Sequence, residues 1–332
     1  MSKPTAARIY RGTPRTLIRL ARRLRAGELV AVPTETVYGL AANALDARAC
    51  RKIFSAKGRP TTDPLIVHIH ATRQLADLAE VNDAARQLIG KFWPGPLTLV
   101  LPKKSIVPAI VSAGLPSVAV RMPSHPLFRK LLKLAGVPLA APSANPFGYV
   151  SPTTAQHVRD GLGRRIRHIL DGGPARVGLE STIVDLRDPA RPRLLRPGAV
   201  TRAELERALG QRVRLIGRDP ARGRVREAQV APGLLARHYS PRTPIVLHAT
   251  LAAPSNRAPD EAWVLAAKPR GPGAPNVFWL DGRGELRGTA RQLFATLRRL
   301  DDGRFKKIHI ALARGGGLAE AINDRLRRAA AR

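Results

Sequence analysis

The sequence of 332 residues is poor in cysteine, and this excludes several classes of protein. Its one cysteine, Cys50, rules out a disulfide framework and a structural zinc site built from several cysteines. No apolar run approaches the ~20 residues that a membrane-spanning helix needs. The basic N-terminus is not followed by an apolar core of about 7–15 residues. We therefore expect no signal peptide, no membrane partner and a cytoplasmic location.

Acidic residues are also scarce, since 24 Asp and Glu stand against 57 Lys and Arg, for a formal net charge of +33. This excess is typical of nucleic-acid-binding proteins and predicts weak, salt-sensitive, nonspecific binding to RNA, tRNA included. However, 46 of the basic residues are arginine and 11 are lysine, and the arginines are spread along the chain without a dense tail. Genome-wide codon bias would produce the same distribution, so the charge alone does not predict a function.

The standard sequence signatures of nucleotide binding are missing. The chain has no G-x-x-x-x-G-K-[ST] motif and no G-x-G-x-x-G after a strand, and it also lacks the G-x-S-x-G turn of many hydrolases. A binding site must therefore be built from other loops.

Alternating short apolar runs and amphipathic segments predict an α/β protein of two domains. We expect a first domain over residues 10–216, a linker rich in Arg, Gly and Pro over 217–243, and a smaller α/β domain over 244–332. The expected helices cover residues 16–26, 46–56, 71–79, 83–91, 125–134, 153–162, 202–209, 289–300 and 318–330. The expected strands cover residues 8–10, 29–32, 65–69, 97–101, 117–123, 138–142, 183–186, 213–216, 245–247, 262–266, 276–280 and 308–312.

The most informative stretch follows the apolar run 29–32. Pro33 ends this predicted strand, and two threonines, a glutamate and a tyrosine follow before Gly39 closes the segment. Polar groups directly after a buried strand lie where open α/β sheets bind ligands. An ordinary helix start, with Thr34 as N-cap, explains this stretch equally well.

Similar loops follow later strands and helices. Lys57 and Arg59 stand two apart on a Gly/Pro loop, which suits either an oxyanion clamp or a solvated surface loop. Ser143 and Asn145 follow the strand 138–142, where a ligand site or a simple turn would use the same residues. His68 lies in an apolar strand, where a core histidine is as natural as a ligand. Hydroxyls and fixed cations together suit an amino acid plus a polyphosphate, with catalysis by positioning and charge stabilisation.

Taken together, these motifs resemble the YrdC-like threonylcarbamoyl-AMP synthases. The family's order and spacing are matched by PTETVYGL at residues 33–40, KGRP at 57–60, SAN at 143–145 and STIVD at 181–185. HYSP at 238–241 and the second domain resemble the long, two-domain form. The resemblance covers residues 10–332 and implies a twisted open mixed sheet with helices, followed by a smaller Rossmann-like α/β domain.

The resemblance also implies a reaction. L-threonine, bicarbonate and ATP would give L-threonylcarbamoyl-AMP and pyrophosphate, with Mg²⁺ as the expected cofactor of ATP. The product would pass to threonylcarbamoyl-transfer proteins that modify adenosine 37 of tRNA.

The resemblance further implies the site residues. Lys57 and Arg59 would be catalytic, and the segment around His238 and Tyr239 would be a lid over the site, whereas Tyr38 would shape the pocket. L-threonine would be held by Thr34, His68, Arg121, Ala141 and Ser181. ATP would be held by Lys57, Arg59, Thr61, Ser117, Ser143, Asn145, Ser151 and Arg196.

Two other functions fit parts of the sequence. A non-catalytic RNA-binding module of the same fold would use the positive charge but would not need the hydroxyl-rich loops. A carbamoyltransferase of the hydrogenase-maturation type contains a similar domain, but it also carries cysteine-rich zinc modules that a chain with one cysteine lacks.

Overall fold

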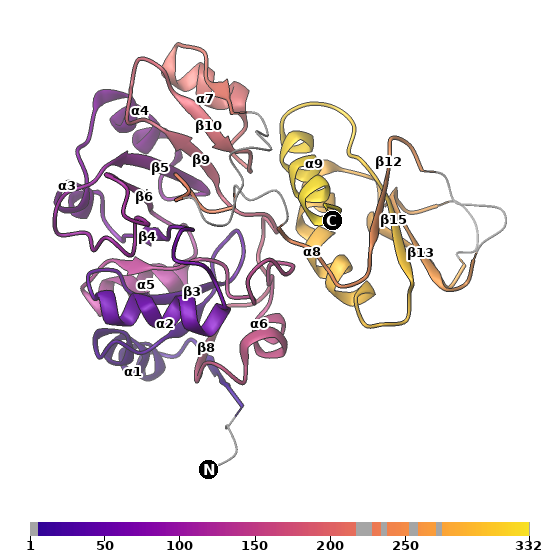
Figure 1. Ribbon diagram of the computed structural model, residues 1–332, viewed down its shortest axis with the longest axis horizontal. Coiled ribbons are helices and arrows are strands. Elements are labelled where there is room, and N and C mark those ends of the chain that lie inside the picture. Colours follow the sequence, from indigo (N-terminus) through magenta and orange to yellow (C-terminus); the bar gives the residue numbers. More distant parts are fainter. Residues whose placement is uncertain (1–5, 217–227, 234–237, 252–257, 270–273, 332) are drawn as a thin grey trace.

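The computed structural model describes residues 6–216, 228–233, 238–251, 258–269 and 274–331, and Figure 1 shows them as two lobes. The larger lobe contains one mixed sheet with helices around it, and the smaller lobe contains a second sheet. Within the described ranges, no helix combines the length and apolar character needed to cross a bilayer. The α/β class and the twisted mixed sheet predicted from the sequence are confirmed.

Eleven of the described strands form the sheet of the large lobe, in the order β1-β8-β2-β3-β7-β4-β6-β5-β9-β10-β11. Neighbours are both parallel, as in β4 with β6, and antiparallel, as in β2 with β3. The strands are β1 (Arg8–Arg11), β2 (Val30–Val32), β3 (Gly39–Asn43), β4 (Ile66–His68), β5 (Leu97–Pro102), β6 (Ser117–Arg121), β7 (Leu139–Ala140), β8 (His168–Asp171), β9 (Thr182–Asp185), β10 (Arg193–Arg196) and β11 (Arg214–Leu215). The helices are α1 (Pro14–Arg25), α2 (Ala47–Lys57), η1 (Thr72–Gln74), α3 (Leu75–Leu78), α4 (Asp83–Phe92), α5 (Pro126–Ala135), α6 (Ala155–Leu162) and α7 (Arg202–Leu209).

The helix α1 shows how local sequence specifies these elements. Thr13 caps it by accepting a hydrogen bond from the Thr16 amide, and Pro14 occupies the first helical position. Leu17, Leu20 and Leu24 recur on one buried face that packs against α5, while the arginines lie on the other face. Burial of each leucine contributes about 1.5–3 kcal/mol, so this face accounts for the position of the helix.

The structure decides between the two interpretations of the segment after β2. Residues 33–38 are a connection between adjacent strands that ends at Gly39, as predicted, but Gly39 also begins a strand that was not predicted, β3, which pairs antiparallel with β2. The alternative of a helix start at Thr34 is therefore excluded. The small residues Gly-Leu-Ala-Ala-Asn of β3 have low strand propensity, and pairing with β2 and β7 overrides it. The single helix predicted over 71–79 is two short pieces, η1 and α3.

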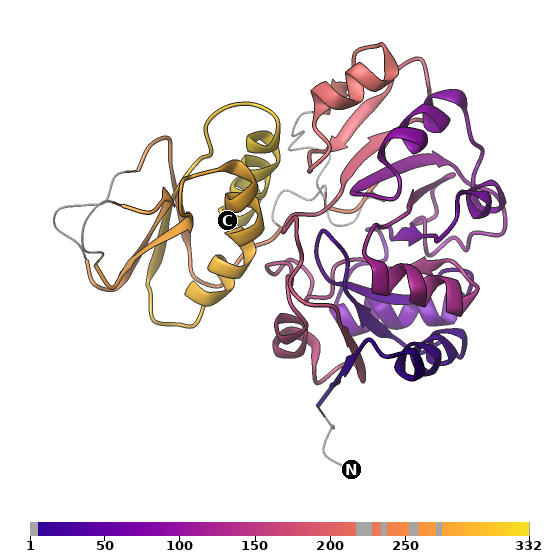
Figure 2. The same ribbon diagram turned by 180° about the vertical axis from the view of Figure 1, so that it is seen from behind.

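The small lobe contains four parallel strands in the order β12-β15-β13-β14. They are β12 (Ile245–His248), β13 (Glu261–Ala267), β14 (Val277–Asp281) and β15 (Lys307–Ala311), and the helices are α8 (Leu286–Leu300) and α9 (Leu318–Ala329). Figures 1 and 2 show both helices between this sheet and the large lobe. The two lobes therefore meet through α8 and α9.

The contact between the lobes is tightly packed. One hydrophobic cluster contains Phe294 and Leu297 of α8 together with Val37, Val150 and Leu179 of the large lobe. Gly178 has φ 80°, and a Cβ at this position would lie 2.5 Å from the Arg291 Cα atom of α8. Only a residue without a side chain permits this approach, so the lobes share a continuous core.

Candidate active site

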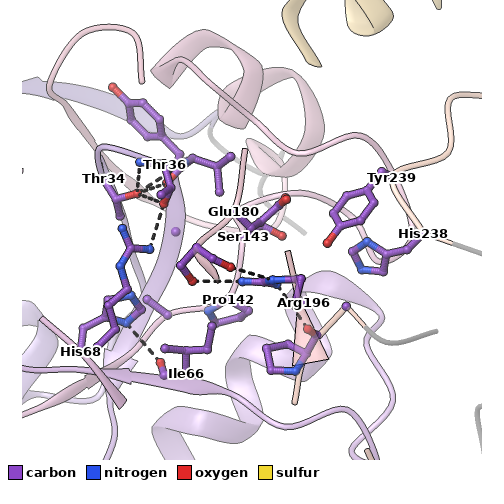
Figure 3. A pocket seen from close by; sticks show the side chains of 18 of the residues that line it. Thr34, Thr36, Ile66, His68, Pro142, Ser143, Glu180, Arg196, His238 and Tyr239 are labelled. Atoms are coloured by element: carbon purple, nitrogen blue, oxygen red, sulfur yellow. Dashed lines mark hydrogen bonds between the residues drawn. The ribbon is translucent and has the colours of Figure 1, made fainter. Parts of the chain in front are cut away.

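A polar pocket lies in the large lobe, and Figure 3 shows His238 and Tyr239, from the segment before β12, on one side of it. Its cavity volume, counted as the space open to the centre of a water molecule, is about 40 Å³. Its walls come from the 33–38 connection, from strands β4, β6 and β10, and from the loops that follow α2 and β7 and precede β9. The lining residues are Thr34, Thr36, Val37, Tyr38, Gly39, Arg59, Ile66, His68, Arg121, Ala141, Pro142, Ser143, Glu180, Ser181, Arg196, Pro232, Gly233, His238 and Tyr239.

A network of hydroxyls and one arginine forms the first end of the pocket. The Thr34 hydroxyl donates to the Val37 carbonyl and accepts from the Val37 amide, which fixes the turn after β2. The Thr36 hydroxyl lies 2.7 Å from that of Thr34 and accepts a hydrogen bond from Nη1 of Arg121. Arg121 is buried and also pairs with Glu35 over 2.7 Å. Burial favours a raised pKa for Glu35, but the Arg121 guanidinium more than offsets it and holds the pKa below its ordinary value.

His68 ends β4 beside this network. Its Nδ1 lies 3.2 Å from the Ile66 carbonyl, to which it donates, and its ring contacts Phe128. Burial, assisted by the nearby Arg121 charge, lowers the pKa of His68 to about 3, so the imidazole is neutral at physiological pH. The residue is thus both a hydrogen-bonded core histidine and part of the pocket wall.

Lys57 is the last residue of α2, Gly58 adopts φ 63° and terminates the helix, and Arg59 follows it. The Lys57 ammonium donates to the carbonyls of Ser143 and Asn145, both at 2.5 Å, and therefore holds the loop after β7. Arg59 forms a buried ion pair with Asp63 and lines the pocket. Burial, and secondarily the charge of Arg59, lowers the pKa of Lys57 well below its ordinary value.

A third arginine of the pocket, Arg196 of β10, lies at the end near His238 and Tyr239 (Figure 3). Its Nε donates to the Ser181 carbonyl at 3.0 Å, and its Nη2 donates to the Ser181 hydroxyl at 3.1 Å. Its Nη1 donates to the Pro232 carbonyl in the segment that leads to the second lobe. The guanidinium is therefore held in place by the pocket loops and faces the same cavity as Arg59.

His238 and Tyr239 cover this end. Tyr239 is 1% exposed, its ring stacks on Phe294 of α8, and His238 packs edge-on against it. Burial lowers the pKa of His238 well below its ordinary value, so its ring is neutral. Residues 217–227 and 234–237 of the predicted linker lie outside the described residues.

Two family models match the chain. "Telomere recombination" covers residues 22–198, and "Threonylcarbamoyl-AMP synthase, C-terminal domain" covers residues 200–331. The chain is also 42% identical over 323 residues to the threonylcarbamoyl-AMP synthase of Pyrococcus abyssi, in an alignment that covers 92% of this chain and 91% of that one. The chain is an enzyme of the threonylcarbamoyl-AMP synthase family.

Other members of the threonylcarbamoyl-AMP synthase family are similar too. The Bacillus subtilis protein of that name is 46% identical over 226 residues, which cover 68% of this chain and 64% of the relative. The crystal structure of P. abyssi Sua5 complexed with L-threonine matches with a TM-score of 0.88 at 38% identity and covers 98% of both chains. These similarities support the catalytic interpretation over the non-catalytic RNA-binding module.

Within this family site, some predicted residues lie apart from the pocket lining. Lys57 and Asn145 do not line the pocket, but Lys57 donates to the Asn145 carbonyl in the loop after β7. Thr61 is exposed. Ser117 begins β6, at the opposite end of the strand from Arg121, about 13 Å away at the usual strand rise. Ser151 is buried and donates to Glu180.

The sequence interpretation missed Glu180 and the 232–233 turn. Glu180 directly precedes the STIVD motif in the sequence and lines the pocket in the structure. Its position next to this motif is the sequence feature that could have identified it as a site residue. Gly233 adopts φ 80°, and a Cβ there would lie 2.8 Å from the Tyr239 hydroxyl oxygen. The turn therefore packs closely against the tyrosine that covers the pocket.

Proposed function

We propose that this chain converts L-threonine, bicarbonate and ATP into L-threonylcarbamoyl-AMP and pyrophosphate. One observation carries the proposal: a single buried pocket has a hydroxyl–arginine network around Arg121 at one end and two fixed cations, Arg59 and Arg196, at the other. The first end suits an α-amino acid with a hydroxyl group, and the second suits a polyphosphate.

At the amino-acid end, Arg121 is the group that can pair with the carboxylate of threonine. Ser181, whose hydroxyl already lies 2.8 Å from that of Thr98, and Thr34 offer hydrogen bonds, and the backbone at Ala141 lies in the wall. The neutral imidazole of His68 adds no charge that would repel the amine. Such fixed partners favour a small hydroxylated amino acid over a larger one.

At the nucleotide end, the chemistry is a displacement at phosphorus. The threonine amine and bicarbonate condense to a carbamate with loss of water. A carbamate oxygen then attacks the α-phosphorus of ATP, and the bond to the β-phosphate breaks to release pyrophosphate. Arg59 and Arg196 stabilise the leaving negative charge, and Lys57 supports them by holding the Ser143–Asn145 loop.

Closure by His238 and Tyr239 has a chemical purpose in this scheme. Both the carbamate and the mixed anhydride with AMP are hydrolysed by water. A buried tyrosine over the pocket excludes water while the reacting groups are held together.

Mg²⁺ remains an expected companion of ATP. Among the described residues, no group of three or more His, Cys, Asp or Glu side chains is arranged to hold a metal. The carboxylate of Glu180 lines the cavity, and Glu35 pairs with the lining residue Arg121; each of the two is paired with a buried arginine. This donor set does not fit a metal held by the protein, so the ion would come with the phosphates of the nucleotide.

We further propose that the product passes to proteins that transfer the threonylcarbamoyl group to tRNA, and that this takes place in the cytoplasm.

Pyrophosphate release tests the reaction directly. The assay contains ATP and bicarbonate and compares L-threonine with L-serine, D-threonine and no amino acid. We expect release that requires both L-threonine and bicarbonate. Release without an amino acid would identify a different acceptor, and tight salt-sensitive RNA binding without release would favour the non-catalytic module.

A further inference from the structure

Arg325 of α9, in the small lobe, contacts a residue of the pocket wall. This arginine is fully buried, and its Nε donates to Oε2 of Glu180 over 2.9 Å. The other oxygen of Glu180 accepts a hydrogen bond from the Ser151 hydroxyl at 2.5 Å. Because Glu180 lines the pocket, this one carboxylate joins the pocket wall to the second lobe.

Arg325 also supports the residue that covers the pocket. Its guanidinium carbon lies 5.3 Å from the centroid of the Tyr239 ring, and its Nη1 donates to Asp324. Tyr239 adopts φ 62°, a left-handed conformation that is costly for a residue with a bulky side chain. The stack on Phe294, the edge-on His238 ring and the Arg325 guanidinium all contact the ring and stabilise this conformation.

The charge of Arg325 matters because Glu180 shares the pocket with Arg196. Burial lowers the pKa of Arg196 and the charge of Arg325 adds to this effect, whereas Tyr239 and Glu180 oppose it, so the charges of Glu180 and Arg196 interact. Without Arg325, Glu180 would lose the buried cation that pairs with it. Its negative charge would then compete with a polyphosphate for Arg196.

We propose that Arg325 is a positioning residue of the active site, which neutralises Glu180 and braces Tyr239 so that the docked second lobe sets the nucleotide end of the pocket. The proposal rests on the proposed function, since it assigns the polyphosphate to Arg59 and Arg196. It makes the second lobe part of the catalytic unit, although Arg325 touches no substrate.

The test compares Arg325→Met with the double variant Arg325→Met/Glu180→Gln and with Glu180→Gln alone. Pyrophosphate release that depends on L-threonine and bicarbonate gives kcat and the KM for ATP of each variant. We expect Arg325→Met to raise this KM about 10–100-fold, because the carboxylate of Glu180 loses its α9 partner and competes with ATP for Arg196. The double variant should return to within about threefold of Glu180→Gln, because the competing charge is gone.

Arg298→Met is the matched control. Arg298 of α8 is a second arginine between the lobes and is half-buried, but it donates to the carbonyls of Val150 and Ser151 and not to a carboxylate. Its loss should lower the unfolding midpoint and leave the KM for ATP unchanged. If Arg325→Met does not fold, Arg325→Lys provides the same measurement, with a smaller factor in the same direction.

Two results would overturn the proposal: a KM for ATP in Arg325→Met that equals that of the wild type, or an increase that Glu180→Gln does not relieve in the double variant. A wild-type chain without threonine- and bicarbonate-dependent release would instead contradict the proposed function. The proposal for Arg325 would then be decided by the affinity of the same variants for ATP in isothermal titration calorimetry.

Discussion

The carboxylate of Glu35 lies 2.7 Å from the guanidinium of Arg121, and both side chains are almost fully buried at one end of the pocket. The pair balances charge inside the pocket before any substrate enters. A substrate carboxylate must therefore share Arg121 with Glu35, which makes the geometry around this arginine decisive for amino-acid binding.

Substitution of Arg121 should separate its binding role from its structural role. Arg121→Met leaves Glu35 unpaired, which should lower the free energy of unfolding by about 3–5 kcal/mol. It should also raise the KM for L-threonine at least about tenfold, since the partner of the substrate carboxylate is lost. In Arg121→Met/Glu35→Gln, we expect stability to recover and the KM for L-threonine to stay high. Recovery of both would show that Arg121 does not bind the substrate carboxylate.

Glu35 should contribute to acid sensitivity. Its pKa is lower in the folded state than in the unfolded chain, so the unfolded state binds more protons as the pH falls below about 4.5. The stabilisation is present above that pH and is lost as the pH falls through the folded-state pKa. Urea denaturation between pH 3 and pH 6 should therefore show a steeper fall in stability for the wild type than for Glu35→Gln. Parallel curves would contradict this assignment.

His68 should remain neutral over the physiological range. Its folded-state pKa of about 3 lies below the value near 6.5 of the unfolded chain, so stability is present above pH 6.5 and declines as the pH falls between these values. In NMR titrations, the ring resonances of His68 should not shift between pH 5 and pH 8, with His68→Gln used for assignment. A titration near pH 6.5 would show that the imidazole is solvated and charged in solution.

Lys57 should act through the loop that it holds. Replacement by Met leaves the carbonyls of Ser143 and Asn145 without their donor, which should lower the free energy of unfolding by about 1–3 kcal/mol. Turnover should fall by more than this loss of stability explains, because the loop that Lys57 holds includes Ser143, which lines the pocket. The exposed Lys91 of α4 offers a matched control, since Lys91→Met should change neither quantity. Unchanged turnover in folded Lys57→Met would exclude a role for the loop.

Two substitutions of Tyr239 test the packing of its ring and the role of its hydroxyl group separately. In the described part of the chain its hydroxyl has no hydrogen-bond partner, while its ring stacks on Phe294. Tyr239→Phe should therefore preserve the unfolding midpoint, whereas Tyr239→Ala should lower stability by about 3–5 kcal/mol. If the hydroxyl meets the nucleotide, Tyr239→Phe lowers turnover about tenfold; equal turnover and ATP affinity would leave it only a packing role.

Much of the architecture could be predicted from local patterns. The apolar period of α1, its Thr13 cap and the glycine after α2 are encoded within a few residues. The strand β3 could not be predicted in this way, because its small residues become a strand only by pairing with β2 and β7. Strand pairing is non-local, so neither composition nor periodicity reports it.

The sequence alone determined which loops carry hydroxyls and cations, because Thr34, Arg59, Ser143 and Ser181 follow or precede apolar runs in a fixed order. Only the tertiary structure decided which of these groups meet. The pair of Glu35 and Arg121 joins residues 86 positions apart, and that of Glu180 and Arg325 joins residues 145 positions apart across two lobes. The physical reason is that a side chain's direction follows from its local backbone, whereas its partner is set by sheet order and by the packing of α8 and α9 against the large lobe.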